Sequence, residues 1–372
     1  MIGRLRLKLR RRQHAKRRAG ELRAPFDLAA RRRVLFLAVD HPIPQSQLFG
    51  FHHYADRFRD MWDAEFREIP VDGTLDAELV KRATTICIQT NFDISDDALA
   101  AILAQIDAHN PGARRVYLDW FAPTDLRLAE RVGPHVDAYV SKHVLRDRSQ
   151  YGEPTFGDTT LMDHYGKAHG LDHETREFII PKGFLKKIYV GPSFLTADFM
   201  LPKFARGRMP RGPRPADLHA RIAVEGTPWY RAMRQGCAEA VSRLEGVRAV
   251  TGTGIPHARF LRELRASKMC FCPFGYGEVC WRDYEAILCG AALVKQDMSH
   301  VETAPDIFIP DETYVPVKWD MSDFEPRVRD LLADHVKRKR IARNAFEVLH
   351  DYARSDAFVA QMAPALFGDE AK

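Results

Sequence analysis

Short apolar runs alternate with amphipathic stretches through the first half of the chain. "RRRVLFLAVDHP" at residues 31–42 and "TTICIQT" at 84–90 are compact apolar runs, typical of strands buried on both faces. Three further runs of this kind are "FREIPV", "RRVYLDWF" and "VDAYVSK". Between these runs the pattern predicts helices at 48–62, 76–82, 95–108 and 124–132. Ser95 is a suitable N-cap for the third helix. Strands alternating with helices predict a doubly wound α/β domain.

A second α/β series follows a region with weaker periodicity. Residues 144–187 predict long loops with short helices, "KKIYVGPSF" predicts a strand, and the proline- and arginine-rich stretch 203–218 predicts a linker. The strands expected after it are "ARIAVEG" (220–226), "VRAVTGT" (247–253), "KMCFCPF" (268–274) and "AALVKQ" (291–296). The helices expected there lie at 228–244, 257–267, 279–289, 322–333 and 335–353. Ser322 and Glu325 predict a capping box at the fourth of them.

The two series predict two α/β domains in tandem, a number that suits a chain of 372 residues. The expected division is a basic tail (1–33), an N-terminal α/β domain (34–190), a C-terminal α/β domain (191–353) and a C-terminal tail or helix (354–372).

Charge is distributed unevenly along the chain. Residues 1–33 hold thirteen Lys and Arg against two acids, a local charge of +11, so the formal charge of +6 leaves the rest of the chain at −5. Such a tail suits an anionic membrane surface or nucleic acid, and the interleaved Ile2, Leu5, Leu7 and Leu9 favour the membrane. A solvated arm without a partner is an equally good interpretation. The acidic body argues against an extended nucleic-acid track.

The chain has no apolar run long enough to span a bilayer, and no apolar segment follows the basic start, so we expect neither a membrane span nor a signal peptide. Its six cysteines are therefore expected to be reduced in the cytoplasm. Four of them lie between 270 and 289, which raises the possibility of zinc, but their spacing is not that of a C-x2-C site. Buried small apolar side chains are the favoured interpretation, and no metal is expected.

The stretch "CPFGYGEVCWRDYEAILCG", residues 272–290, carries the strongest functional pattern. Its loop follows a buried strand, and in an open α/β sheet ligands bind outside the carboxyl ends of the strands. Gly275 and Gly277 permit a close backbone approach, and a helix beginning near Glu278 would direct its N–H groups at a diphosphate. Arg282 and Glu285 share one face of that helix and suit phosphate and a ribose diol. A tight turn with a surface ion pair is the alternative.

The run "SKMCFCPFGYGEVCWRDYEAILCGAALVKQD", with "YVPVKWDMSDFEPRVRDLL" and "RIARNAFEVLHDYA" after it, resembles the donor domain of GT-B glycosyltransferases. The resemblance is closest to the exostosin-like and "glycosyl transferases group 1" families and covers residues 219–353. It implies two Rossmann-like doubly wound domains facing across a cleft. It also implies that Glu285 binds the donor ribose, that Arg282 lies near the diphosphate, and that Glu278 faces the sugar. Here the two glutamates follow an E-x6-E pattern rather than the family's E-x7-E. Lys295 and Asp297 are expected at the same edge, although Lys295 replaces a residue that is usually small or apolar.

Other candidates follow further strands. Gly252 and Gly254 either border the nucleotide base, as the resemblance implies, or form a plain turn. Arg221 and Lys268 are weaker candidates for contact with phosphate. The candidates for the catalytic base, which lie at strand ends of the first domain, are Asp40, His41 and Asp119, and His52 and His53 are possible substrate contacts. An apolar setting beside Trp120 would raise the pKa of Asp119.

Together these features predict a glycosyltransferase that moves a sugar from a nucleotide-sugar donor to a glycan or lipid-linked acceptor. Protein cations would neutralise the leaving group, so no cofactor or metal is expected. The expected location is cytoplasmic, peripheral to the inner membrane face through residues 1–33. The alternatives are a nucleic-acid-binding protein that uses the basic arm, and a nucleotide-sugar epimerase or hydrolase on the same fold.

Overall fold

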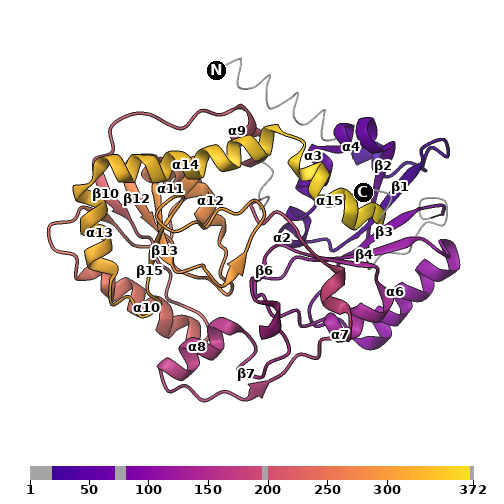
Figure 1. Ribbon diagram of the computed structural model, residues 1–372, viewed down its shortest axis with the longest axis horizontal. Helices are drawn as coiled ribbons and strands as arrows, with labels where there is room; N and C mark the ends of the chain where they lie inside the picture. Colours follow the sequence, from indigo (N-terminus) through magenta and orange to yellow (C-terminus); the bar gives the residue numbers. More distant parts are fainter. Residues whose placement is uncertain (1–18, 72–80, 195–199, 369–372) are drawn as a thin grey trace.

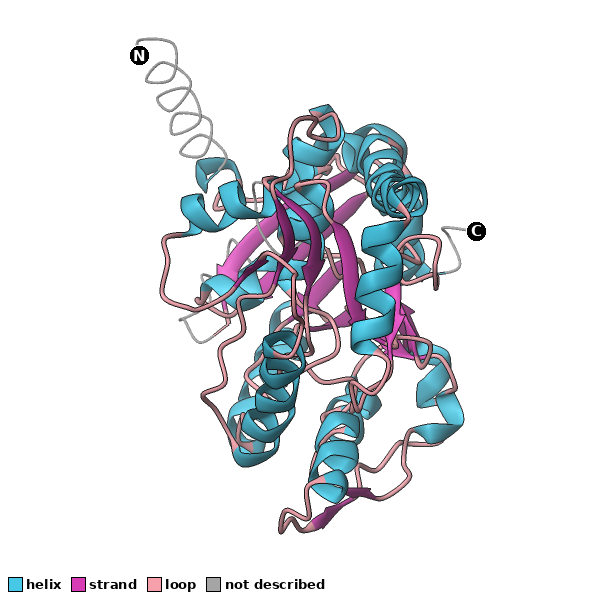
Figure 2. Cartoon of the chain, turned by 90° about the vertical axis from the view of Figure 1, so that its left-hand side faces the viewer, coloured by secondary structure: helices cyan, strands magenta, loops and turns pink. Residues whose placement is uncertain are grey.

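The computed structural model describes residues 19–71, 81–194 and 200–368. The predicted helix at 76–82 and most of the basic tail lie largely outside these ranges. Two parallel sheets form the frame of the molecule, one in each half (Figure 1). Helices flank the strands on both sides (Figure 2), which is the doubly wound arrangement that the alternating pattern predicts.

The first sheet has six parallel strands in the order β2-β1-β3-β4-β5-β9. These strands are β1 (Arg32–Ala38), β2 (Ala64–Pro70), β3 (Thr85–Ile88), β4 (Arg114–Asp119), β5 (Ala138–Ser141) and β9 (Ile188–Val190). Around them lie α2 (Pro42–Ser46), α3 (Phe49–His53), α4 (Ala55–Trp62), α6 (Asp96–His109) and α7 (Ala129–Val132). The helix α8 (Thr160–Ala168) lies apart from this sheet and packs beside α10 (Pro228–Ser242) of the second half (Figure 1). Ser95 caps α6 as expected, accepting a hydrogen bond from the Ala98 amide.

The second sheet has five parallel strands in the order β11-β10-β12-β13-β15. These strands are β10 (Ala216–His219), β11 (Ala249–Val250), β12 (Ser267–Phe271), β13 (Ala292–Gln296) and β15 (Val315–Val317). The helices of this half are α9 (Met200–Arg206), α10 (Pro228–Ser242), α11 (His257–Arg265), α12 (Trp281–Leu288), α13 (Phe324–Ala333) and α14 (His335–Arg354).

Two further features join the halves. The short strands β6 (Val144–Leu145) and β14 (Val301–Glu302) pair antiparallel across them. The last helix, α15 (Ala357–Phe367), returns to the first half, where Thr85 Oγ1 and Arg114 Nε donate hydrogen bonds to carbonyls of its final turn (Figure 1). A second small sheet pairs β7 (Thr155–Phe156) with β8 (Thr175–Arg176).

Three local predictions are wrong. The strand expected at 220–226 lies earlier, at β10, because Asp217 and His219 interrupt its apolar pattern although both are buried there. The helix expected at 124–132 is reduced to α7, since Leu126 has a φ of 51° and cannot continue a helix. The capping box at Ser322 is absent, because α13 starts after Asp323, whose carboxylate accepts a hydrogen bond from the Lys318 amide instead.

Candidate functional site

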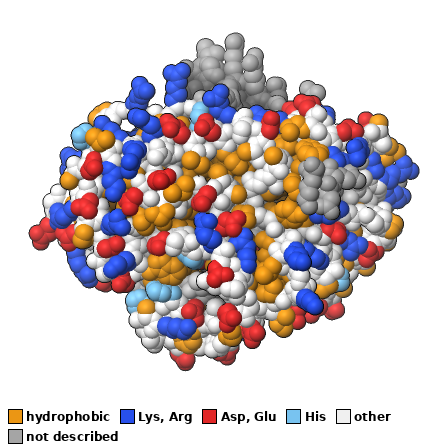
Figure 3. Space-filling view, in the orientation of Figure 1, with side chains coloured by type: hydrophobic (Ala, Val, Ile, Leu, Met, Phe, Trp, Pro, Cys, Tyr) orange, Lys and Arg blue, Asp and Glu red, His pale blue; other side chains and the backbone are white. Residues whose placement is uncertain are grey.

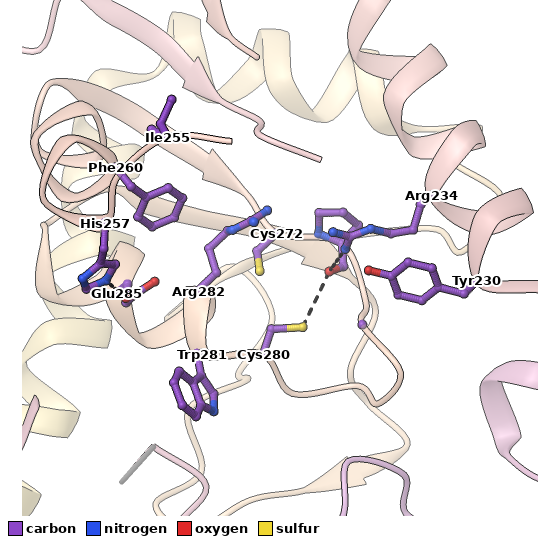
Figure 4. A pocket seen from close by; sticks show the side chains of 12 residues that line it. Tyr230, Arg234, Ile255, His257, Phe260, Cys272, Cys280, Trp281, Arg282 and Glu285 are labelled. Atoms are coloured by element: carbon purple, nitrogen blue, oxygen red, sulfur yellow. Dashed lines mark hydrogen bonds and ion pairs between the residues drawn. The ribbon is translucent and has the colours of Figure 1, made fainter. Parts of the chain in front are cut away.

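A cavity of about 430 Å³ opens at the carboxyl end of β12. Its walls come from α10, from the start of α11, from the loop between β12 and α12, and from α12 itself, and we call it the β12 cavity (Figure 4). Its volume lies in the range of small-ligand pockets. The strand edge is where open α/β sheets bind ligands.

Glu285 lies on one side of the β12 cavity, paired with His257. Its Oε1 is 2.5 Å from His257 Nε2, and its side chain is nearly buried while the imidazole is half exposed. His257 is the first residue of α11 and is reached through the loop that contains Gly252 and Gly254, both of which have positive φ. These glycines do not line the cavity themselves, but they lead the chain to Ile255 and His257, which do. The carboxylate can accept hydrogen bonds from a ligand diol.

Two guanidinium groups approach the cavity from opposite walls (Figure 4). Arg282, on α12, donates from Nη1 to the Arg221 carbonyl at 2.5 Å and covers the Phe260 ring at 5.5 Å. Arg234, on α10, donates to the carbonyls of Ala223, Pro273 and Phe274 and is almost wholly buried. The backbone carbonyls fix both cations in place, a favourable arrangement for binding an anion.

Arg221 and Lys268, the weaker candidates for phosphate contact, each form an ion pair with a carboxylate. Arg221 forms a two-bond pair with Glu263 at 2.7 and 3.1 Å, and Lys268 Nζ lies 2.6 Å from Asp217. Neither residue lines the β12 cavity. Arg221 also lies after β10 rather than within the first strand of the domain.

The helix that carries Arg282 and Glu285 begins later than expected. α12 starts at Trp281 with Cys280 as its N-cap, and the Asp283 carboxylate accepts a hydrogen bond from the Cys280 amide at 2.8 Å. One N-terminal amide is therefore used by the helix's own cap rather than left for a ligand. Lys295, predicted to line the cleft, is fully buried behind the cavity, where its Nζ lies 3.2 Å from Asp283 Oδ1. Gly290 ends the helix with a φ of 73°, as expected for a C′ glycine.

The two glycines of the loop have different surroundings. Gly275 lines the β12 cavity, and a Cβ added there would meet Cys280 Sγ at an ordinary 3.4 Å. A Cβ added at Gly277 would lie 1.9 Å from the carbonyl oxygen of Ala122, in the first half of the molecule. The close approach predicted at Gly277 therefore exists, but it is between the two halves of the protein.

Glu278 also lies at the junction of the halves. Its carboxylate is buried within 3.9 Å of His143 Nε2 and 3.5 Å of His300 Nε2, and Thr124 Oγ1 donates to it at 3.4 Å. Burial raises the pKa of Glu278, but His300 and His143 outweigh it and hold this pKa below its usual range. Burial lowers the pKa of His143 to about 4, so its ring is neutral at pH 7.

Several polar atoms in the cluster of Glu278, His143 and His300 make no hydrogen bond to the described residues. Glu278 Oε2, both His143 ring nitrogens and His300 Nε2 are buried without a hydrogen-bond partner among the described residues. Buried polar atoms without a hydrogen bond are costly, so their concentration at one point suggests that a polar ligand completes them. Neither histidine was predicted from the sequence: His143 meets Glu278 only through the pairing of the halves, and His300 meets it from the loop after β13.

The predicted base candidates of the first half lie apart from the β12 cavity. Asp40 lines a separate cavity of about 160 Å³ and accepts a hydrogen bond from Gln45, while His41 caps α2. Asp119 is buried, and its oxygens accept hydrogen bonds from the Phe121 amide and the Tyr139 hydroxyl, each at 2.9 Å. These hydrogen bonds indicate that Asp119 has a structural role at the end of β4. His52 lies against Glu68 at 2.6 Å.

Asp119 should make the stability of the protein depend on pH. Burial raises its pKa from 3.8 to about 6, so the folded protein holds this proton more tightly than the unfolded chain does. Its stabilising contribution is therefore complete below pH 4 and is lost as pH rises through 6. Between pH 4 and 8 the unfolding free energy of the wild type should fall relative to that of Asp119→Asn by up to about 3 kcal/mol. Denaturant titrations across this range measure the difference, and parallel profiles for the two proteins would contradict it.

A second cavity, of about 580 Å³, lies between the halves. Aromatic side chains from both sides line it, and we call it the aromatic cavity; they are Phe92, Trp120, Phe121, Trp229 and Tyr276. Tyr276 stacks on Tyr230 of the β12 cavity, with ring centroids 4.5 Å apart, so the two cavities are neighbours. A third, outer cavity of about 480 Å³ shares Phe92, Arg127 and His173 with the aromatic cavity and extends the hollow along the first half.

Three comparisons relate this architecture to known proteins. Residues 213–363 match a family model described as glycosyl transferase-like. All residues that line the β12 cavity lie within this range. No curated protein matches the chain significantly in sequence. The narrower exostosin-like resemblance stays a prediction. Of the helices that the structure describes, none is both long and apolar enough to cross a membrane.

Similar solved structures are alpha-glucosyltransferases. One, in complex with UDP, has 12% identity and a TM-score of 0.51 over 90% of this chain and 99% of its own. Another, with UDP and a 13-mer DNA containing a HMU base, has 12% identity and a TM-score of 0.52 over 91% and 98%. At this identity the likeness concerns the fold. The chain thus has the GT-B fold, and its residues 213–363 match a glycosyl transferase-like family model.

Proposed function

We propose that this protein is a glycosyltransferase that binds a nucleotide-sugar donor in the β12 cavity. The observation that carries the proposal is the convergence of Glu285, Arg282 and Arg234 on one cavity at the carboxyl end of β12. The cavity lies within the glycosyl transferase-like domain, and the similar fold was solved with UDP bound. A carboxylate for a ribose diol and two fixed guanidinium groups for a diphosphate are the chemistry that a nucleoside diphosphate requires.

We also propose that the reaction needs no metal ion. Arg234 and Arg282 supply two positive charges beside the cavity, held by backbone carbonyls before any ligand arrives. Cations fixed in advance stabilise the charge that develops on a leaving diphosphate. Glu278, His143 and His300 would bind the hydroxyl groups of the transferred sugar, which accounts for their unpaired buried atoms.

The acceptor would lie in the aromatic cavity, and its chemistry favours a neutral glycan. Flat aromatic side chains flanked by polar groups are suited to stacking against sugar rings. The cations of the aromatic and outer cavities are paired with acids: Arg127 with Asp125, Arg131 with Asp96, and Arg176 with Glu174. On the face shown in Figure 3, Lys and Arg are largely interspersed with Asp and Glu. Binding a phosphate backbone requires cations that are not already paired with acids. DNA, which is present in one of the similar structures, would therefore fit the aromatic and outer cavities poorly.

Nucleoside diphosphates should stabilise the protein through Glu285. One of UDP, GDP, ADP or CDP, at about 100 times its dissociation constant, should add roughly 2.7 kcal/mol to the unfolding free energy, and CMP serves as a monophosphate comparison. Glu285→Ala should lose most of this stabilisation because the ribose contact is removed. Thermal shift measures both, with and without EDTA, which should leave the result unchanged.

The matched control for this experiment is Glu325→Ala, an exposed helical glutamate paired only with Arg329 among the ion pairs described. It should respond to nucleotides as the wild type does. If Glu285→Ala responds equally well, or if none of the nucleotides stabilises the wild type, the proposed donor site is wrong. Product analysis with and without acceptor separates transfer from hydrolysis or epimerisation.

Phe92→Ala should weaken acceptor binding alone. This ring is 52% exposed and lines both the aromatic and the outer cavity, so its removal costs a stacking surface with little loss of stability. We expect the KM for a glycan acceptor to rise about tenfold, which corresponds to a stacking contribution near 1.4 kcal/mol, while the nucleotide response stays intact. Ile179→Ala, at a similarly exposed apolar position (55%), is the control. An unchanged acceptor KM in Phe92→Ala would contradict the placement.

A further inference from the structure

Two cysteine thiols lie side by side at the β12 cavity. Cys272 follows β12 and is buried, whereas Cys280 caps α12 and is half-buried, and both line the cavity (Figure 4). Their sulfur atoms and an Asp283 carboxylate oxygen all lie within 4.8 Å of one another, and Cys280 Sγ lies 3.7 Å from the Pro273 carbonyl oxygen. The remaining four cysteines do not line the cavity.

The surroundings of this pair favour a reactive thiol over a metal site. Both Asp283 oxygens are already engaged, one by the Cys280 amide at 2.8 Å and one by Lys295 at 3.2 Å. The Lys295 ammonium supplies the positive charge that a metal ion would otherwise bring. The adjacent Cys272 thiol, with help from Lys295 and Arg234, lowers the pKa of the Cys280 thiol and outweighs burial and Asp283, which raise it. A thiolate that is stabilised in this way and open to a cavity is the form that oxidants attack.

We propose that Cys280 and Cys272 form a peroxide-reactive dithiol whose disulfide obstructs the β12 cavity. The Cys280 thiolate attacks the O–O bond of hydrogen peroxide, which gives a Cys280 sulfenic acid and hydroxide. Cys272 then attacks the sulfenic sulfur, loses its proton and expels a second hydroxide, which is protonated to water. Two thiols and one peroxide thus yield one disulfide and two waters, and a dithiol reductant reverses the change.

The pairing also has a structural consequence. Closing the bond draws the first residues of α12 toward the loop after β12, and α12 carries Arg282 and Glu285. We therefore expect the oxidised protein to bind nucleotide less well. This consequence rests on the proposed function, whereas the oxidation itself does not.

The test uses the full chain, reduced and then treated with a few equivalents of hydrogen peroxide. Two of the six thiols should be lost on titration under denaturing conditions, and the tryptic peptide 269–282 should lose two hydrogens while remaining one chain. Cys272→Ser should halt at a Cys280 sulfenic acid that dimedone traps, and Cys280→Ser should retain both free thiols of that peptide. Cys270→Ser, the neighbouring cysteine on β12, is the control and should form the disulfide normally.

The outcomes are distinct. Equal peroxide oxidation in Cys280→Ser, or a disulfide that requires Cys270, overturns the proposal. The rate of Cys280 alkylation by iodoacetamide gives a second measurement that needs no disulfide: it should exceed that of Cys237 or Cys289, and an equal rate also overturns it. If the disulfide forms normally but no nucleoside diphosphate slows alkylation of Cys280, the dithiol stands and the proposed donor site falls.

Discussion

Replacing Gly277 with alanine should reduce turnover by about 100-fold while nucleotide binding is largely retained. The added Cβ would lie 1.9 Å from the Ala122 carbonyl oxygen and 2.5 Å from its carbon. Both atoms belong to backbone, so neither can rotate aside, and the two halves must separate locally. That displacement moves Glu278, the next residue, away from His143 and Thr124 of the first half. The β12 cavity itself is built within the second half and should stay intact.

The neighbouring glycine gives the control. The Cβ of Gly275→Ala would meet Cys280 Sγ at 3.4 Å and the Gly277 carbonyl oxygen at 3.7 Å, both ordinary contacts, in a backbone conformation without a positive φ, so the variant should retain nearly full activity. Steady-state kinetics with a saturating donor, together with nucleotide thermal shift, separate turnover from donor binding. Equal kcat in the two variants would mean that the contact between the halves has no part in the reaction.

The difference between the two glycines illustrates what sequence can and cannot predict here. Apolar runs predicted all six strands of the first sheet and three of the second, β11, β12 and β13, since a strand buried on both faces is apolar throughout, whereas β15 was not predicted. β10 was placed wrongly because its buried Asp217 is neutralised by Lys268, a partner on another strand. The sequence predicted a close approach to a ligand at Gly277, whereas the close neighbour that the structure shows there is the Ala122 backbone.

The site shows the same limit. Arg282 and Glu285 were predicted because both lie on one short helix, where spacing alone determines which residues share a face. Arg234, His257, His143 and His300 were not, since each reaches its position through an element distant in sequence. His257 had the best local signal, because it opens a helix directly after Gly252 and Gly254. Arg234 had no local sequence signal, because its hydrogen-bond partners are backbone carbonyls and these cannot be recognised from side-chain types.

Lys295→Met should destabilise the protein by about 3–5 kcal/mol, the cost of leaving a buried charge without its partner. Lys295 and Asp283 are both completely buried, 3.2 Å apart, and Lys295 Nζ also donates to the Cys272 carbonyl at 3.2 Å. Removing the ammonium leaves the Asp283 carboxylate uncompensated. Denaturant unfolding measures the loss. The control is Lys167→Met, at an exposed pair with Asp163, which should cost less than about 1 kcal/mol.

The double variant Lys295→Met/Asp283→Asn decides whether the charge or the packing matters. An asparagine at 283 keeps an oxygen for the Cys280 amide and removes the unpaired charge, so much of the lost stability should return. No recovery would mean that Lys295 acts through its volume and its place over the Phe274 ring, 5.1 Å away. Recovery would mean that Lys295 stabilises the fold mainly by neutralising the Asp283 carboxylate, which caps α12. In that case the lysine that the sequence placed in the cleft acts from behind it, by holding in position the helix that carries Arg282 and Glu285.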